Sequence, residues 1–163
     1  MPPRPKKWQL VADLARIPEL DSNAVGIRRM GVEDSASLGK LFFDAYVGTI
    51  DYEGETKQDA HHAIEASFRG DFGDFDTQAS MVIERNGILV SATFITSWKL
   101  NPLLAFVVTA PSWQGRGLAR NCTIASMRVL AKMGHRELRL FVTPGNEPAT
   151  ALYKRLGFSR VAS

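Results

Sequence analysis

Between residues 107 and 133 the chain forms a predicted strand, a glycine-containing loop and a predicted helix, and this order favours phosphate binding. Gly115 and Gly117 stand where the helix would begin. Backbone N–H groups at a helix start have no partner within the helix, and the helix dipole adds about half a positive charge there. Such a start binds phosphates, and glycine lets the backbone approach them closely. Arg116 and Arg120 are placed to add positive charge.

Two common phosphate-binding loops do not fit this segment. The loop does not end in Gly-Lys-Ser/Thr, so it is not a P-loop. It also lacks the third glycine of the dinucleotide fingerprint, and no short strand with a terminal acid follows about 20 residues later. A different kind of phosphate-containing ligand is therefore expected.

Two spaced motifs resemble those of the GNAT acetyltransferase superfamily. The first is Gln114-x-x-Gly117-x-Ala119, which is similar to the Q/R-x-x-G-x-G/A signature of that family, with Pro111 three residues ahead of it. The resemblance is specific over residues 104–158.

The second motif is Asn146-x-x-Ala149-x-x-Leu152-Tyr153-x-x-x-Gly157-Phe158, which resembles the family's second cofactor motif. A predicted strand over 138–142 leads into it. Over residues 26–103 the resemblance is only topological, and it is absent over 1–25.

The resemblance implies an acyltransferase that uses acetyl-CoA as co-substrate and no metal. The pantetheine arm would hydrogen-bond to exposed strand backbone, and the pyrophosphate would lie on the loop amides. Asn146 would bond the pantetheine arm, and Tyr153 would protonate the departing CoA thiolate as a general acid. The implied reaction is N-acetylation of a primary amine by direct attack. The implied cofactor-binding residues of the strand and loop are Val107, Val108, Thr109, Gln114, Gly115, Arg116, Gly117, Leu118 and Ala119.

The group that takes the proton of the acceptor amine stays open. Many family members carry a glutamate on the strand before the phosphate loop, but the predicted strand 103–109 contains no acid. The remaining candidates are a carboxylate elsewhere (Glu84 is the only strand acid nearby), His61 or His62 of the second predicted helix, or a water chain. The missing carboxylate also favours an alternative function, a non-catalytic acyl-CoA-binding or regulatory module, whereas Tyr153 argues against it.

Hydrophobic periodicity predicts the elements that must position these residues. Helices are predicted over 33–46, 56–69, 117–133 and 148–156, and strands over 26–30, 80–85, 88–98, 103–109 and 138–142. Asn86-Gly87 predicts a tight hairpin between two of the strands. The order predicts an α/β (α+β) fold with a mixed sheet. The resemblance implies a mostly antiparallel sheet flanked by helices, with splayed central strands forming the acetyl-CoA cleft.

The length of 163 residues fits one domain. We expect an N-terminal extension over 1–25 and a single N-acetyltransferase domain over 26–163. Family sheets usually continue with two strands after the second motif, but only residues 159–163 remain here. The alternatives are a partner chain, such as the second copy in a homodimer, or lost residues.

Charge and composition narrow the partners. Residues 44–76 hold nine acids against two bases, and the family's acceptor site is lined by the corresponding region. This favours a small-molecule or peptide amine that is cationic: a polyamine, an aminoglycoside, a lysine side chain or a protein N-terminus. Residues 112–163 hold nine bases against two acids but no interleaved aromatics, so no nucleic-acid partner is expected.

Cysteine and histidine usage limits the other possibilities. The single cysteine, Cys122, excludes an internal disulfide and a cysteine-based metal site, and three histidines, two of them adjacent, do not suggest zinc. No apolar run approaches the roughly 20 residues that span a bilayer. We therefore expect no membrane partner and a cytoplasmic location.

Overall fold

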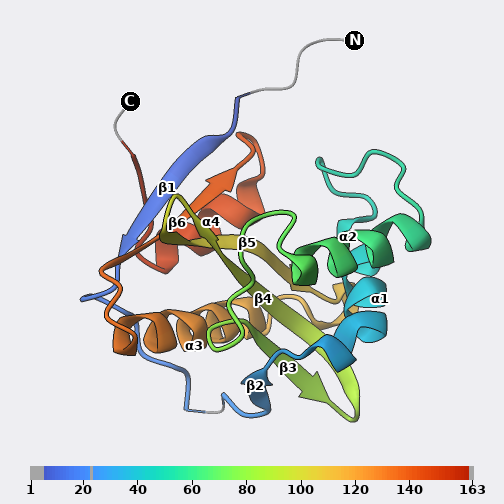
Figure 1. Cartoon of the computed structure of the whole chain (residues 1–163), viewed down its shortest axis with the longest axis horizontal. Coiled ribbons are helices and arrows are strands. Elements are labelled where there is room, and N and C mark those ends of the chain that lie inside the picture. The colour runs from blue at the N-terminus through green and yellow to red at the C-terminus, as the bar shows by residue number, and fades with distance from the viewer. Residues whose placement is uncertain (1–5, 23, 162–163) are drawn as a thin grey trace.

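The computed structural model describes residues 6–22 and 24–161. Its seven strands form one mixed sheet in the order β2-β3-β4-β5-β6-β1-β7 (Figure 1). The strands are β1 (Trp8–Asp13), β2 (Ile27–Arg29), β3 (Met81–Arg85), β4 (Ile88–Trp98), β5 (Asn101–Thr109), β6 (Glu137–Val142) and β7 (Ser159–Arg160). The helices are α1 (Ser35–Tyr46), α2 (Lys57–Arg69), α3 (Leu118–Lys132) and α4 (Glu147–Arg155), with short 3-10 turns at Val32–Asp34 and Pro111–Trp113.

Helices cover both faces of the sheet because successive side chains of a strand point to opposite faces. Val82 packs in a cluster with Leu38 of α1 and Ile64 of α2. Its neighbour Ile83 packs in another cluster with Cys122 of α3. The α4 side chains pack with α3, β1 and β6 in a third cluster. The predicted α/β (α+β) fold is confirmed.

Local sequence signals explain where several elements begin and end. Thr56 caps α2: its hydroxyl accepts a hydrogen bond from the Asp59 N–H, while the Asp59 carboxylate accepts one from the Thr56 N–H. The β3–β4 hairpin turns at Asn86 and Gly87, with φ of 54° and 77°. Both angles are positive, as a type I′ turn requires.

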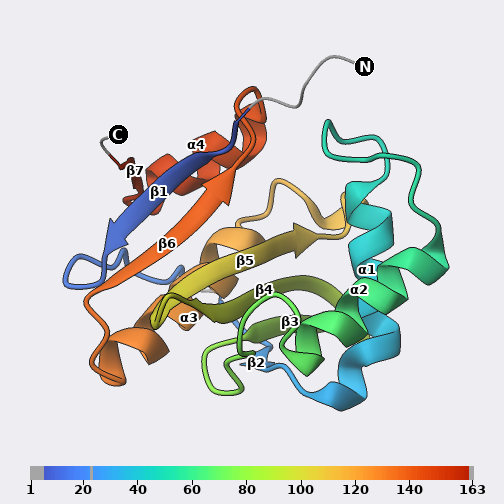
Figure 2. The same ribbon diagram turned by 45° about the horizontal axis from the view of Figure 1, so that its top comes forward.

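The central strands β5 and β6 run parallel but separate soon after they meet (Figure 2). Among the described residues, the only pair in register is Leu103 with Arg139. On its other edge β5 stays paired with β4, although Ala105 is an extra residue between the pairs Phe94–Phe106 and Ile95–Leu104. Such a bulge increases the local twist of a strand. The predicted splay of the central strands is confirmed.

The N-terminal segment contributes a strand that sequence analysis missed. Strand β1 pairs antiparallel with β6 from Trp8↔Val142 to Asp13↔Glu137, and β7 pairs with its other edge. Leu10 is buried against the core. Residues 8–13 are therefore part of the sheet and not an extension.

Strand β1 is the neighbour of β6 on the edge that faces away from β5. Residues 8–13 of the same chain occupy the place beside β6. The boundary at residue 25 stays a prediction for the rest of the segment, of which residues 1–5 and 23 lie outside the described residues.

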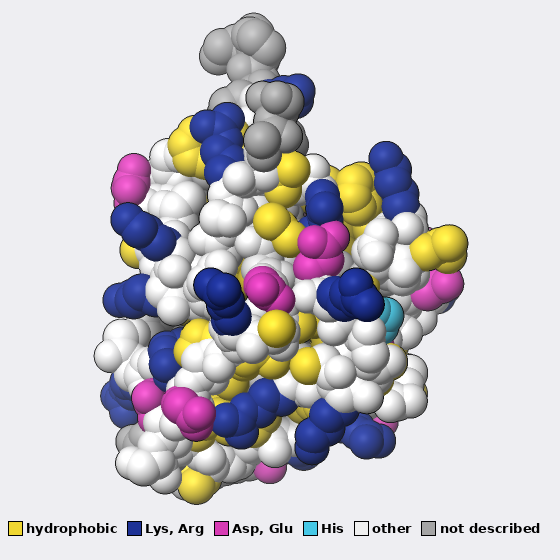
Figure 3. Space-filling view, turned by 90° about the vertical axis from the view of Figure 1, so that its left-hand side faces the viewer, with side chains coloured by type: hydrophobic (Ala, Val, Ile, Leu, Met, Phe, Trp, Pro, Cys, Tyr) yellow, Lys and Arg dark blue, Asp and Glu magenta, His cyan; other side chains and the backbone are white. Residues whose placement is uncertain are grey.

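The surface carries mixed charge on the side of the molecule that Figure 3 shows. Lys and Arg side chains are spread over this side, with acidic and hydrophobic side chains between them. Across residues 6–22 and 24–161, no helix is long and apolar enough to cross a bilayer.

Candidate active site

A cleft of about 640 Å³ opens where β5 and β6 separate. Two walls face each other across it: β5 with the loop before α3 on one side, and the end of β6 with α4 on the other. Ten of the eleven residues predicted from the sequence line it: Val107, Val108, Thr109, Gln114, Gly115, Gly117, Leu118, Ala119, Asn146 and Tyr153.

The loop between β5 and α3 presents unpaired amides to this cleft. Gly115 and Gly117 have φ of +78° and +75°, and Gly117 is the N-cap residue of α3. Within the described part of the chain, the backbone N–H groups of residues 115–120 donate to no backbone carbonyl. Helix-start amides that point away from the helix are suited to an anion, so the loop fits a pyrophosphate.

Arg116 is the predicted residue that does not line the cleft. Its guanidinium lies over the ring of Trp113, 4.5 Å from the ring centre, and donates to the Ser112 carbonyl at 3.5 Å. The guanidinium is thus held on an aromatic face, outside the lining of the cleft.

Arg120 does line the cleft, but much of its charge is already engaged. It donates to the Asp21 carboxylate at 3.2 Å and to the Glu19 carbonyl at 2.9 Å, both in the segment between β1 and β2. The positive potential at the helix start therefore comes mainly from backbone amides.

Asn146 caps α4 from the other wall. Its side-chain oxygen accepts a hydrogen bond from the Ala149 N–H at 3.4 Å. An asparagine amide also carries two N–H donors. With the oxygen used for the cap, those donors are available to a carbonyl acceptor in the cleft.

Tyr153 lies half-buried on α4, with its ring edge-on to that of Phe158 at 5.7 Å. Its hydroxyl makes no hydrogen bond to a residue in the described ranges. Burial raises the pKa of the Tyr153 phenol well above its usual value near 10, and the neighbouring Tyr46 and Asp51 raise it further. The phenol is therefore protonated at neutral pH and able to donate a hydrogen bond.

Three residues on the opposite rim complete the cleft and were not singled out from the sequence. Tyr46 ends α1, and Thr49 and Asp51 follow it in the connection to α2. Thr143, just after β6, donates its hydroxyl to the Asp51 carboxylate at 2.9 Å. In the sequence Asp51 is one of nine acids in the 44–76 segment, and no spacing distinguishes it from the others.

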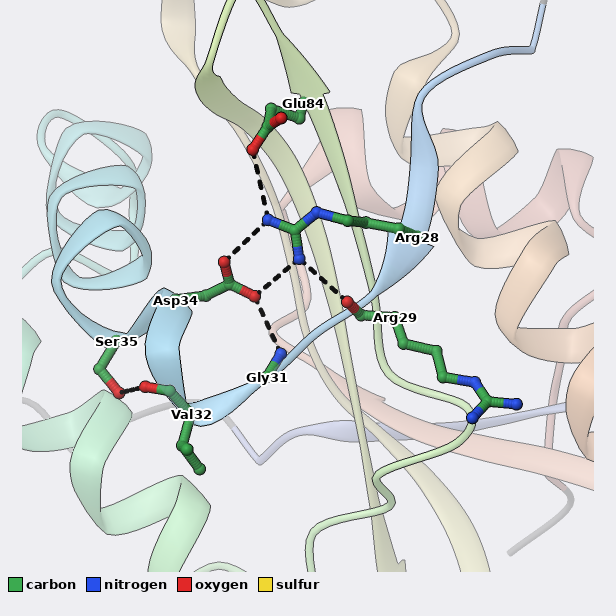
Figure 4. Close-up of polar contacts among 7 residues, drawn as sticks. All are labelled: Arg28, Arg29, Gly31, Val32, Asp34, Ser35 and Glu84. Carbon is green, nitrogen blue, oxygen red and sulfur yellow. Dashed lines mark hydrogen bonds and ion pairs between the residues drawn. The ribbon is translucent and has the colours of Figure 1, made fainter.

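The acid and the histidines considered from the sequence lie elsewhere. Glu84, on β3, accepts from Arg28 at 3.3 Å, and the same guanidinium makes two bonds to Asp34 (Figure 4). His61 packs against Gly39 of α1, and His62 is exposed. None of these side chains lines the cleft.

Comparisons with known proteins agree with this fold. Residues 43–158 match the model of the acetyltransferase (GNAT) family. The mycothiol acetyltransferase of Amycolatopsis mediterranei is 46% identical over 50 residues, which make up 31% of this chain and 17% of that protein. The chain therefore matches only a small part of that relative's length.

Solved structures give the same answer at the level of the fold. A GCN5-related N-acetyltransferase from Sphaerobacter thermophilus superposes with a TM-score of 0.73 at 19% identity, covering 97% of this chain and 50% of that one. The PaiA N-acetyltransferase of Thermoplasma acidophilum, solved in complex with coenzyme A, gives 0.61 at 17% identity, covering 79% and 86%. With its family match over residues 43–158 and this shared fold, the chain belongs to the GNAT acetyltransferase family.

Proposed function

We propose that this protein transfers the acetyl group of acetyl-CoA to a primary amine, which attacks the thioester directly. The observation that carries the proposal is the edge of β5 that faces β6 and is open where the two strands separate. Strand β5 leads from there to the unpaired amides of residues 115–120. An extended pantetheine arm needs strand backbone to bond to, and a pyrophosphate needs donors at the end of that strand. The cleft offers both in this order.

The side chains along the cleft support the same reaction. Acetyl-CoA supplies the activated acetyl group. The backbone of Val107–Thr109 would bind the pantetheine arm, and the Asn146 amide would donate to one of its carbonyls. Tyr153 would donate a hydrogen bond to the sulfur as the C–S bond breaks. Full transfer of its proton is uphill, because a thiol has a pKa of about 8.5 and the phenol a higher one.

A non-catalytic acyl-CoA-binding module is the second candidate. It is favoured by the absence of an acid on β5, where the sequence 103–109 has none. Binding without turnover is what this alternative predicts, so one pair of measurements separates the two functions.

Isothermal titration with CoA and acetyl-CoA tests the cofactor, with and without chelator. We expect binding that the chelator does not abolish. Comparable affinity for NAD or ATP, together with none for CoA, would refute the cofactor assignment.

The second measurement follows free thiol while the protein is incubated with acetyl-CoA and a panel of amines. Release that depends on the amine supports catalysis, whereas binding with no release supports the module.

A further inference from the structure

The turn that follows α1 places Asp51 at the rim of the cleft. The Thr49 N–H and hydroxyl both donate to the Tyr46 carbonyl, at 3.0 and 2.9 Å. The Tyr52 N–H then donates to the Thr49 carbonyl at 3.1 Å, which closes a tight turn around Asp51. The carboxylate is thus carried by a hydrogen-bonded turn directly after a helix.

A contact across the cleft orients the Asp51 side chain. Thr143, 92 residues further along the chain, donates its hydroxyl to one carboxylate oxygen at 2.9 Å. Thr143 follows β6, so the contact joins the α1–α2 connection to the far wall. A carboxylate has about four acceptor positions, and this bond uses one of them. The half-buried Asp51 can therefore accept further N–H donors.

Asp51 is the only carboxylate among the described residues that line the cleft, and no histidine lines it. The negative charge of Asp51 acts on two tyrosines, Tyr46 of α1 and Tyr153 of α4. Burial is the main cause that raises the pKa of Tyr46 to about 12, and Asp51 adds to it. Asp51 likewise adds to the raised pKa of Tyr153. The other ionisable side chains on the cleft are Lys7, Arg120 and Arg155.

We propose that Asp51 binds the ammonium group of the acceptor and takes its proton, across the cleft from Tyr153. This inference deepens the proposed acetyl transfer and rests on it. The acceptor class that follows is a primary amine that is cationic at neutral pH. An alkylammonium has a pKa near 10.4, so it must lose a proton before it can attack.

The proton and electron balance is complete with the residues of the cleft. A proton passes from the acceptor ammonium to an Asp51 oxygen, which later returns it to solvent. The freed lone pair forms a C–N bond to the thioester carbonyl carbon. The C–S bond then breaks, and the sulfur leaves with the bonding pair as a thiolate that accepts a hydrogen bond from the Tyr153 hydroxyl. The second proton of the acceptor nitrogen passes to solvent, so the phenol keeps its own proton throughout.

Two kinds of nucleophile distinguish this role from a structural one. Spermidine, kanamycin and a lysine peptide arrive as ammonium ions, whereas hydroxylamine is uncharged at neutral pH and needs no base. The variant is Asp51→Asn, whose amide oxygen can still accept from Thr143. The matched control is Asp44→Asn on α1, whose carboxylate is bound to Lys40 at 2.9 Å and does not line the cleft.

We expect Asp51→Asn to lower kcat/KM for the ammonium acceptors by about 10²–10⁴-fold, the usual contribution of a general base. Transfer to hydroxylamine should fall less than about tenfold, and CoA affinity and the urea midpoint should stay at wild-type values. The deficit with the amines should narrow as pH rises toward the pKa of the acceptor, because the amine then arrives neutral. Asp44→Asn should behave as wild type throughout.

The outcomes separate this inference from the function on which it rests. An equal loss with amines and hydroxylamine would make Asp51 a structural residue and overturn the inference, and so would no loss at all. Wild-type transfer to hydroxylamine but to none of the amines would overturn the cationic acceptor and leave acetyl transfer standing. A wild-type protein that binds acetyl-CoA but transfers to neither nucleophile would refute the proposed function itself.

Discussion

Replacement of Tyr153 by phenylalanine removes one oxygen from the cleft and little else. The ring keeps its edge-on contact with Phe158, and the lost hydroxyl has no hydrogen bond within the described residues. The free energy of unfolding should therefore change by about 0.5 kcal/mol or less. Acetyl-CoA affinity should also stay close to wild type, because the hydroxyl acts only when charge develops on the sulfur.

The expected loss in turnover follows from the protonation state of Tyr153. Its raised pKa keeps the phenol neutral, so it stabilises the developing thiolate chiefly as a hydrogen-bond donor. A hydrogen bond to a charged group contributes about 1.5–3 kcal/mol. At 1.36 kcal/mol per factor of ten, this corresponds to a turnover loss of about 10- to 100-fold.

The assay is thiol release under saturating acetyl-CoA, together with the dissociation constant from titration. Tyr52→Phe is the matched control, because its hydroxyl donates to the Glu55 carbonyl at 3.2 Å and does not line the cleft. A parallel collapse of turnover and acetyl-CoA affinity would make Tyr153 a binding or packing residue. Unchanged turnover would refute the role given to its hydroxyl.

Three further substitutions test the loop, the N-terminal strand and the polar cluster of Figure 4. Gly117→Val should weaken CoA binding tenfold or more. It should also lower the free energy of unfolding by about 1–2 kcal/mol, because φ is +75° there. An unaltered dissociation constant for CoA would mean that this loop does not bind the phosphates. Leu10→Ala should cost about 2–5 kcal/mol in urea unfolding if β1 is part of the core, and a surface-like change below 0.5 kcal/mol would contradict its place beside β6. The Arg28 guanidinium lowers the pKa of the Asp34 carboxyl, so this pair stabilises the fold above the unfolded-state pKa of about 3.9, and the stabilisation is lost as pH falls through the lower folded-state pKa. Asp34→Asn should thus lower stability at pH 7 by about 2 kcal/mol and by progressively less in acid, whereas a deficit that is the same at all pH values would rule out the charge as its cause.

Sequence reasoning succeeded where the determinant of structure is local. The hairpin at Asn86-Gly87 needs two adjacent residues that tolerate positive φ, and the α2 start needs Thr56 three residues before an acid. The loop before α3 likewise turns at two glycines near a helix start, both with positive φ. In each case the physical cause lies within a few residues, so the sequence displays it directly.

Sequence reasoning failed where the determinant is a contact between distant segments. In β1, Leu10 and Ala12 alternate with exposed or half-buried residues, but nothing in residues 8–13 indicates that they pair with β6 more than 120 residues later. The same limit applies to Arg116, whose placement over Trp113 depends on how the loop folds and not on its charge. For Asp51, the distinguishing feature is its bond to Thr143, which only the fold brings within reach.

The loop before α3 and the α1–α2 connection at the rim of the cleft therefore differ in what sets their chemistry. At the loop before α3 the free donors are backbone amides, so we expect a change of side chain that preserves the turn at Gly115 and Gly117 to preserve phosphate binding. At the rim, Asp51 stands on the connection between α1 and α2 and is oriented by Thr143, which follows β6. Substitutions in residues 47–56 can then alter what approaches the thioester without moving the loop amides. We therefore expect the choice of acceptor to depend on this connection, and the use of acetyl-CoA on the loop before α3.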